Sequence, residues 1–188
     1  EQEERVASIG GYIENVKGLP ETFLLRKGTS WGWGTWRRVW SSVDWDGSKI
    51  LEELEKKAVV GDFDFQSGAG FSKMLRNQVA GVNDSWAVRF YGWCFLQNML
   101  HLLPGSSFVQ NIGHDGSGTH CGVSNFFDIV LEEDRLIKRE LITVNESEIA
   151  YQKISTLYQQ QYGRYLRQNQ PTWRRFMTRF NSLTGGLE

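Results

Sequence analysis

Residues 30–40 hold the highest density of large aromatic side chains in the sequence. This segment places four tryptophans and two arginines within eleven residues. An enclosed tryptophan buries about 150–250 Å², which at about 25 cal/mol per Å² stabilises a fold by on the order of 4–6 kcal/mol. Burial alone would therefore explain the rings. Burial does not explain Gly32 and Gly34. Glycines here indicate either unusual backbone angles or a backbone that another group approaches closely, such as a ligand with flat apolar faces.

The composition indicates one globular domain. The 188 residues are 40% hydrophobic and 23% charged, which is enough chain for an ordinary core. The net charge of −1 argues against a general nucleic-acid binder, which needs a basic surface. The two cysteines, Cys94 and Cys121, are too few for a disulfide framework and fit a reducing compartment. No apolar run reaches transmembrane length, and no signal peptide is visible. Taken with the cysteine usage, these features lead us to expect a cytoplasmic protein.

The sequence pattern predicts an α/β fold, with a short mixed sheet covered by helices and with further helices at the C-terminus. A helix is expected to start near Trp33, which would put Trp33, Trp36 and Trp40 on one face. Other segments are assigned by periodicity and by turn residues. They are strands at 6–13, 23–26 and 141–144, extended segments at 102–104 and 107–112, and helices at 48–57, 71–80, 85–99 and 146–168 and from residue 171.

Asp84 stands before the most apolar predicted helix and has two interpretations. Asp84 or Asn83 can serve as the N-cap of this helix, because Asp and Asn are preferred caps and a carboxylate interacts well with the helix dipole. Asp84 can also be a general base beside an aromatic wall and Arg89. Asn145 with Glu148 predicts a capping box for the helix at 146–168.

Residues 111–121 combine glycines with imidazole, carboxylate, hydroxyl and thiol groups. Glycines let backbone N–H groups turn inward around an anion such as a diphosphate, and His and Asp side chains can hold a divalent metal. The alternative is a polar surface loop, because the segment matches neither a Walker loop nor a dinucleotide fingerprint. A nucleophilic pair of Cys121 and His120 is disfavoured, because side chains of adjacent residues rarely face each other.

A basic and aromatic stripe runs through residues 162–179. It contains five arginines beside two tyrosines and a tryptophan. Such a run is usually a solvated helix face. It also fits a peripheral contact with the inner face of a membrane, where each basic residue contributes about 1 kcal/mol.

Four blocks, taken in order, resemble the C-terminal half of bacterial family-2 sugar transferases with a GT-A fold. The blocks are RVASIGGY at 5–12, SWGWGTWR at 30–37, DSWA at 84–87, and NIG with SGTH at 111–113 and 117–120. The resemblance covers residues 4–122, about two thirds of the chain. A more distant similarity is to N-acetylglucosaminyltransferase I, an inverting enzyme. This family binds nucleotide and metal through an N-terminal half with an Asp-x-Asp motif. The chain has no such half, and Asp62 and Asp64 do not stand where the family places that motif.

Carried over residue by residue, the resemblance implies a role for each matching position. Asp84 would be the catalytic base that deprotonates the acceptor hydroxyl. The acceptor would be bound by Trp31, Gly32, Trp33, Arg37, Trp86 and Arg89. His114, Asp115, Ser117 and Thr119 would lie on the donor side, near the diphosphate, and His120 would be a metal ligand. The metal would be Mn²⁺ or Mg²⁺ in the intact enzyme, and none is expected in this fragment.

The resemblance implies a transferase that moves a sugar, with inversion, from a nucleotide-diphosphate sugar to a hydroxyl of a glycan or lipid-linked acceptor. Residues 1–144 would form the acceptor and catalytic-base part of the GT-A domain, and residues 145–186 a C-terminal helical extension. Residues 187–188 look like a cloning scar. We expect the fragment alone to be inactive, to bind no nucleic acid, and to be able to pair with a second copy over its exposed apolar surface. The alternative function is a non-catalytic carbohydrate-binding or interaction module.

Overall fold

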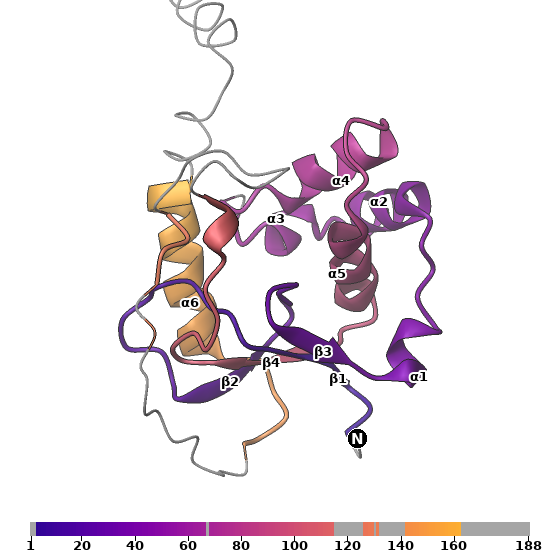
Figure 1. Cartoon of the computed structure of the whole chain (residues 1–188). Coiled ribbons are helices and arrows are strands. Elements are labelled where there is room, and N and C mark those ends of the chain that lie inside the picture. The colour runs from indigo at the N-terminus through magenta and orange to yellow at the C-terminus, as the bar shows by residue number, and fades with distance from the viewer. Residues whose placement is uncertain (1–2, 67, 115–125, 130, 132–141, 163–188) are drawn as a thin grey trace, which may run out of the picture.

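A small mixed sheet of four strands supports the fold (Figure 1). This computed structural model describes residues 3–66, 68–114, 126–129, 131 and 142–162. The strands are β1 (Val6–Gly10), β2 (Thr22–Leu25), β3 (Trp33–Thr35) and β4 (Leu100–Pro104), in the spatial order β2-β4-β1-β3. Strand β4 is parallel to β1 and antiparallel to β2, and β3 is antiparallel to β1. The predicted mixed α/β class is confirmed.

The helices stand mainly on one side of this sheet. Figure 1 shows α6 over the β2 end, whereas α2, α4 and α5 group towards the other end. Their bounds are α1 (Arg37–Trp40), α2 (Gly47–Lys56), α3 (Val60–Phe63), α4 (Phe71–Val79), α5 (Trp86–Leu96) and α6 (Glu148–Leu157), with a 3-10 turn η1 (Ile112–His114) and a π-helical turn η2 (Tyr158–Tyr162) that continues α6. The helices predicted at 48–57, 71–80 and 85–99 are confirmed as α2, α4 and α5.

Two predicted helix caps are wrong by one or two residues. Helix α5 is capped by Ser85, whose hydroxyl accepts a hydrogen bond from the backbone N–H of Val88 at 3.3 Å. The Asn83 side chain instead accepts from the N–H of Ser85, which turns the chain into the helix. Helix α6 is capped by Ser147 rather than Asn145. In both cases a short hydroxyl side chain reaches the amide three residues ahead.

The helix predicted to start near Trp33 is wrong. Residues 33–35 form strand β3, which pairs with β1 so that Trp33 lies opposite Gly10 and Thr35 opposite Ser8. The hydroxyl of Thr35 also donates to the carbonyl of Ala7 at 2.6 Å. Pairing with a distant strand thus outweighs the helical spacing of the tryptophans. Within residues 33–40, only residues 37–40 are helical.

The remaining predictions of secondary structure have mixed outcomes. Residues 102–104 belong to β4, as expected, but residues 107–111 form no strand and are followed by the turn η1. Residues 142–144 are not a strand either, and residue 141 lies outside the described residues. Helix α6 confirms the start of the helix at 146–168. The end of that helix and the helix expected from residue 171 lie outside the described residues.

Three apolar clusters hold the layers together. The first joins the sheet to α6 and includes Phe23 and Leu25 of β2 with Ile154 of α6. The second lies among α2, α3, α4 and α5, and the third lies between β1, α1 and α5. Helix α6 therefore shares a core with the strands of the N-terminal part, which fixes the position of Tyr158 at its end.

Gly32 is required by the backbone at the start of β3. Its φ is +55°, and a Cβ there would lie 2.5 Å from Val109 Cγ1. Its carbonyl accepts the backbone N–H of Gly11 at 2.7 Å. The unusual backbone angle expected for this glycine is confirmed, but the close neighbour is the protein's own chain. Gly34 has no atom within 4 Å of an added Cβ.

The variant Gly32→Ala should lower the free energy of unfolding by about 1–3 kcal/mol, because alanine is strained at positive φ and its methyl group meets Val109. Urea denaturation followed by tryptophan fluorescence measures the change. The matched control is Gly34→Ala, which should stay within about 1 kcal/mol of the wild type because its Cβ meets open space. Equal effects of the two variants would contradict this account.

Candidate functional site

A cavity of about 390 Å³ opens where the loops after β1 and β2 meet the start of α5. Residues from six separate parts of the chain line it, so that it exists only in the folded protein. Its lining consists of Tyr12, Glu14, Lys27, Gly28, Thr29, Ser30, Trp31, Trp33, Phe71, Met74, Ser85, Trp86, Ala87, Val88, Phe90, Tyr91, Phe127 and Tyr158.

One wall of the cavity is a group of indole rings supported by α5. Trp33 stacks on Trp86 with ring centres 5.3 Å apart and an angle of 25° between the rings. Trp40 and Phe90 pack against this pair, with centre distances of 5.8 Å from Trp40 to Trp86 and 5.2 Å from Phe90 to Trp33. Trp86 stays 38% exposed, so part of its ring is available to a ligand.

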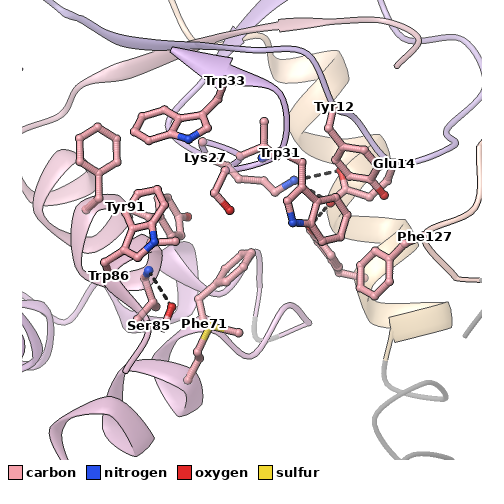
Figure 2. A pocket seen from close by; sticks show the side chains of 18 residues that line it. Tyr12, Glu14, Lys27, Trp31, Trp33, Phe71, Ser85, Trp86, Tyr91 and Phe127 are labelled. Atoms are coloured by element: carbon pink, nitrogen blue, oxygen red, sulfur yellow. Dashed lines mark hydrogen bonds and ion pairs between the residues drawn. The ribbon is translucent and has the colours of Figure 1, made fainter. Parts of the chain in front are cut away.

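The opposite wall is built around Trp31. Its ring meets Tyr12 edge-on at 4.5 Å and Phe127 at 5.3 Å. His114 packs behind this wall, stacked on Phe127 at 4.6 Å and edge-on to Trp31 at 5.6 Å. Figure 2 shows Trp86 on one side of the cavity and Trp31 with Phe127 on the other.

A buried ion pair lies between these walls. Lys27 Nζ donates to both carboxylate oxygens of Glu14, at 2.7 and 2.9 Å, and both residues are only 4% exposed. The Tyr158 hydroxyl donates a hydrogen bond to Glu14 Oε1. The three side chains come from the loops after β1 and β2 and from the end of α6, and Figure 2 shows the Lys27 side chain reaching towards Glu14.

The environment keeps Glu14 ionised. Burial by itself raises the pKa of this carboxyl group, but the Lys27 ammonium and the hydrogen bonds from Lys27 and Tyr158 outweigh it and hold the pKa below its usual value. Burial, together with the negative charges of Glu14 and Asp128, raises the pKa of Tyr12, so that this phenol stays neutral.

His101 supports the loop that carries Lys27. The His101 ring packs under Gly28, where an added Cβ would lie 2.8 Å from Nδ1. Nδ1 is hydrogen-bonded to the hydroxyl of Ser8 at 2.7 Å. Burial, together with the charge of Lys27, lowers the pKa of His101 to about 3, so this ring is neutral at physiological pH.

The acceptor-binding residues expected from the sequence separate into two groups. Trp31, Trp33 and Trp86 line the cavity. The others do not line it: Gly32 and Arg37 are exposed, and Arg89 donates to the carbonyl of Trp45 at 3.2 Å with its guanidinium over that indole ring.

Asp84, the expected base, is exposed and directly precedes Ser85, the first residue of this segment that lines the cavity. The side chain of Asp84 is not part of the lining. It caps no helix either, because the hydroxyl of Ser85 takes that role.

Most of the residues expected at the diphosphate lie outside the described part of the chain. His114 is described and buried behind the Trp31 wall. Asp115, Ser117, Thr119 and His120 are not described, and neither is the basic stripe beyond residue 162. Among the described residues no three His, Cys, Asp or Glu side chains group as a metal site would require.

Sequence reasoning missed the polar centre of the cavity. Glu14, Lys27 and Tyr158 are separated by 13 and 131 residues, and no motif or periodicity relates them. Tyr12 stood in a block that resembled the sugar transferases, but its own role was not assigned. The one local signal was the pair of basic residues, Arg26 and Lys27, after the apolar strand β2, and basic residues are mostly found at protein surfaces.

Comparisons of the chain with protein-family models, with curated proteins and with solved structures gave no significant match. None of the helices within the described ranges combines the length and apolar character needed to cross a bilayer.

The variant Glu14→Leu/Lys27→Met removes the buried pair and keeps similar side-chain volumes. Because the pKa of Glu14 is lower in the folded than in the unfolded protein, its carboxylate adds stability above about pH 5 that is lost as the pH falls through the folded-state pKa. The unfolding free energy of the wild type, relative to the variant, should therefore decrease from pH 6 to pH 3. Urea denaturation at each pH measures it, and a difference independent of pH would contradict the assignment.

Proposed function

We propose that the cavity binds a sugar and that the chain is the acceptor-side half of an inverting glycosyltransferase. One observation carries this proposal. Two sequence blocks that resemble family-2 sugar transferases, at 30–37 and 84–87, are about 50 residues apart and contribute tryptophans to the same cavity. That both blocks contribute to one cavity supports the resemblance, because neither block by itself implies that it lies near the other.

The chemistry of the lining suits a sugar. A pyranose ring presents apolar C–H faces and hydroxyl groups at its edge, so it needs flat apolar contacts together with a few hydrogen-bonding groups. Trp31 and Trp86 offer such contacts from opposite sides, and Glu14, Lys27 and Ser85 offer polar groups. The volume of about 390 Å³ falls in the range of small-molecule sites.

In the proposed reaction Asp84 takes the proton of the acceptor hydroxyl as the oxygen attacks the anomeric carbon of the donor. The bond from that carbon to the nucleoside diphosphate breaks on the opposite face, and its electron pair leaves with the phosphate. The configuration of the sugar is therefore inverted. Support for this role is limited to the chain position of Asp84, which directly precedes Ser85 of the cavity lining.

A carbohydrate-binding module without catalysis is the second candidate. The exposure of Asp84 favours it, because a general base is usually enclosed near its substrate. The two functions share the sugar site and differ in the role of Asp84, so they are separated by different variants.

Trp86→Ala should weaken the binding of neutral methyl glycosides to this chain at least tenfold, because it removes one apolar wall. Isothermal titration calorimetry or ligand-observed NMR measures binding across the glycosides of glucose, galactose, mannose and N-acetylglucosamine. The control is Trp36→Ala, since Trp36 lies outside the cavity against Arg38. No binding by the wild type, or equal binding by both variants, would contradict a sugar site.

Asp84→Asn should reduce sugar transfer by 10²–10⁴-fold in an enzyme that carries this chain together with a nucleotide-binding half, while acceptor binding changes less than about twofold. Release of the nucleoside diphosphate from a nucleotide-sugar donor measures turnover, and circular dichroism checks the fold. Asp62→Asn, in α3 and away from the cavity lining, is the control and should keep normal turnover. Near-normal turnover of Asp84→Asn would reject the base and favour the binding module.

A further inference from the structure

The ion pair of Glu14 and Lys27 has a large desolvation cost in a cavity that is otherwise mostly apolar. Two charges that are 4% exposed lose most of their hydration, and well-packed apolar side chains of similar volume are often equally or more stabilising. Among the described residues that line the cavity, these two carry the only charges. Their position at the wall of a cavity suggests that the pair serves recognition as well as packing.

The pair retains hydrogen-bonding capacity. An ammonium group has three N–H donors, and the hydrogen bonds of Lys27 in the described part of the chain all go to Glu14. Glu14 Oε1 accepts from both Lys27 and Tyr158, whereas Oε2 accepts from Lys27 at 2.9 Å. Within the described residues, at least one N–H of Lys27 and one lone pair of Oε2 therefore remain for a further partner.

A hydroxyl group matches this pair of sites, because it can accept and donate at once. We propose that the Glu14–Lys27 pair recognises one hydroxyl group of a neutral sugar, which accepts a hydrogen bond from Lys27 Nζ and donates one to Glu14 Oε2. This inference rests on the proposed function, in which the cavity binds a sugar, and it names the polar determinant of that binding.

The balance of charge makes the site selective for a neutral ligand. The charges of Glu14 and Lys27 cancel, so the described lining has no excess positive charge for an acidic sugar or a phosphate. The carboxylate of a uronic acid would approach the ionised Glu14, and like charges in a site of low dielectric repel strongly. A neutral hexose satisfies the pair without an uncompensated charge.

Tyr12 adds a second polar group at the same wall. Its hydroxyl is buried and has no hydrogen-bond partner among the described residues, and its pKa is raised by burial and by Glu14. A buried polar group without a hydrogen-bond partner lowers the stability of the fold. A ligand hydroxyl group nearby would supply that partner to the Tyr12 hydroxyl.

The first experiment measures binding of methyl glucoside and methyl glucuronide by the 188-residue chain at neutral pH. The wild type should bind the glucoside at least tenfold more tightly. Glu14→Gln keeps the shape of the side chain and leaves Lys27 with a net positive charge, so its preference should shift towards the glucuronide by at least tenfold. A preference unchanged in Glu14→Gln would overturn the proposal, because a purely structural role of the pair predicts no change in selectivity.

The second experiment identifies the hydroxyl group. Monodeoxy derivatives of the glycoside that binds best are titrated into the wild type and into Glu14→Leu/Lys27→Met. One derivative should lose at least tenfold in affinity for the wild type and less than twofold for the double variant, because the partner of that hydroxyl is already absent there. Equal losses in both proteins would overturn the proposal. If the double variant does not fold, the selectivity of Glu14→Gln decides.

The outcomes separate this inference from the proposed function. If the wild type binds no glycoside, the sugar site itself fails, and the role of the pair fails with it. If the wild type binds and Trp86→Ala weakens binding, but neither variant of the pair changes selectivity, the sugar site stands and only the role of Glu14 and Lys27 is rejected.

Discussion

The buried ion pair between Lys27 and Glu14 is the interaction on which the cavity depends. It joins the loop after β1 to the loop after β2, and the Tyr158 hydroxyl ties the end of α6 to the same carboxylate. Removing one charge from such a pair leaves the other buried without compensation, which is far more costly than losing a surface contact. Because the buried charges of Glu14 and Lys27 must stay paired, the three segments that carry these groups and Tyr158 keep their relative positions. These segments form one side of the cavity.

The aromatic walls follow from the same arrangement. Once the loop after β2 is held by Lys27, Trp31 stands against Tyr12 and Phe127, while Trp33 enters β3 and stacks on Trp86. Burial of these rings stabilises the fold, yet Trp40 remains 42% exposed and Trp86 38% exposed. The fold thus leaves indole surface in contact with solvent, and an apolar ligand face could cover the part of it that borders the cavity.

Prediction from the sequence succeeded where structure is set by near neighbours. Helices α2, α4 and α5 were located from local signals, which are the periodicity of their apolar residues and the cap and turn residues beside them. It failed at β3, a strand of three residues whose state is decided by pairing with β1 some 25 residues away. It also missed Ser85 as the cap of α5, since Asn83, Asp84 and Ser85 are all suitable caps and only the path of the chain selects one.

By itself, the sequence determined the mixed α/β class and the main helices, because composition and local periodicity act over a few residues. Only the tertiary structure decided that Gly32 takes a positive φ where an added Cβ would meet Val109, and that Arg89 donates to the carbonyl of Trp45. It also decided that Glu14 and Lys27 meet in the cavity. Those decisions depend on contacts between segments that are far apart in the chain. Whether a side chain at such a contact is buried, and which charge it meets, is set only when the segments pack together.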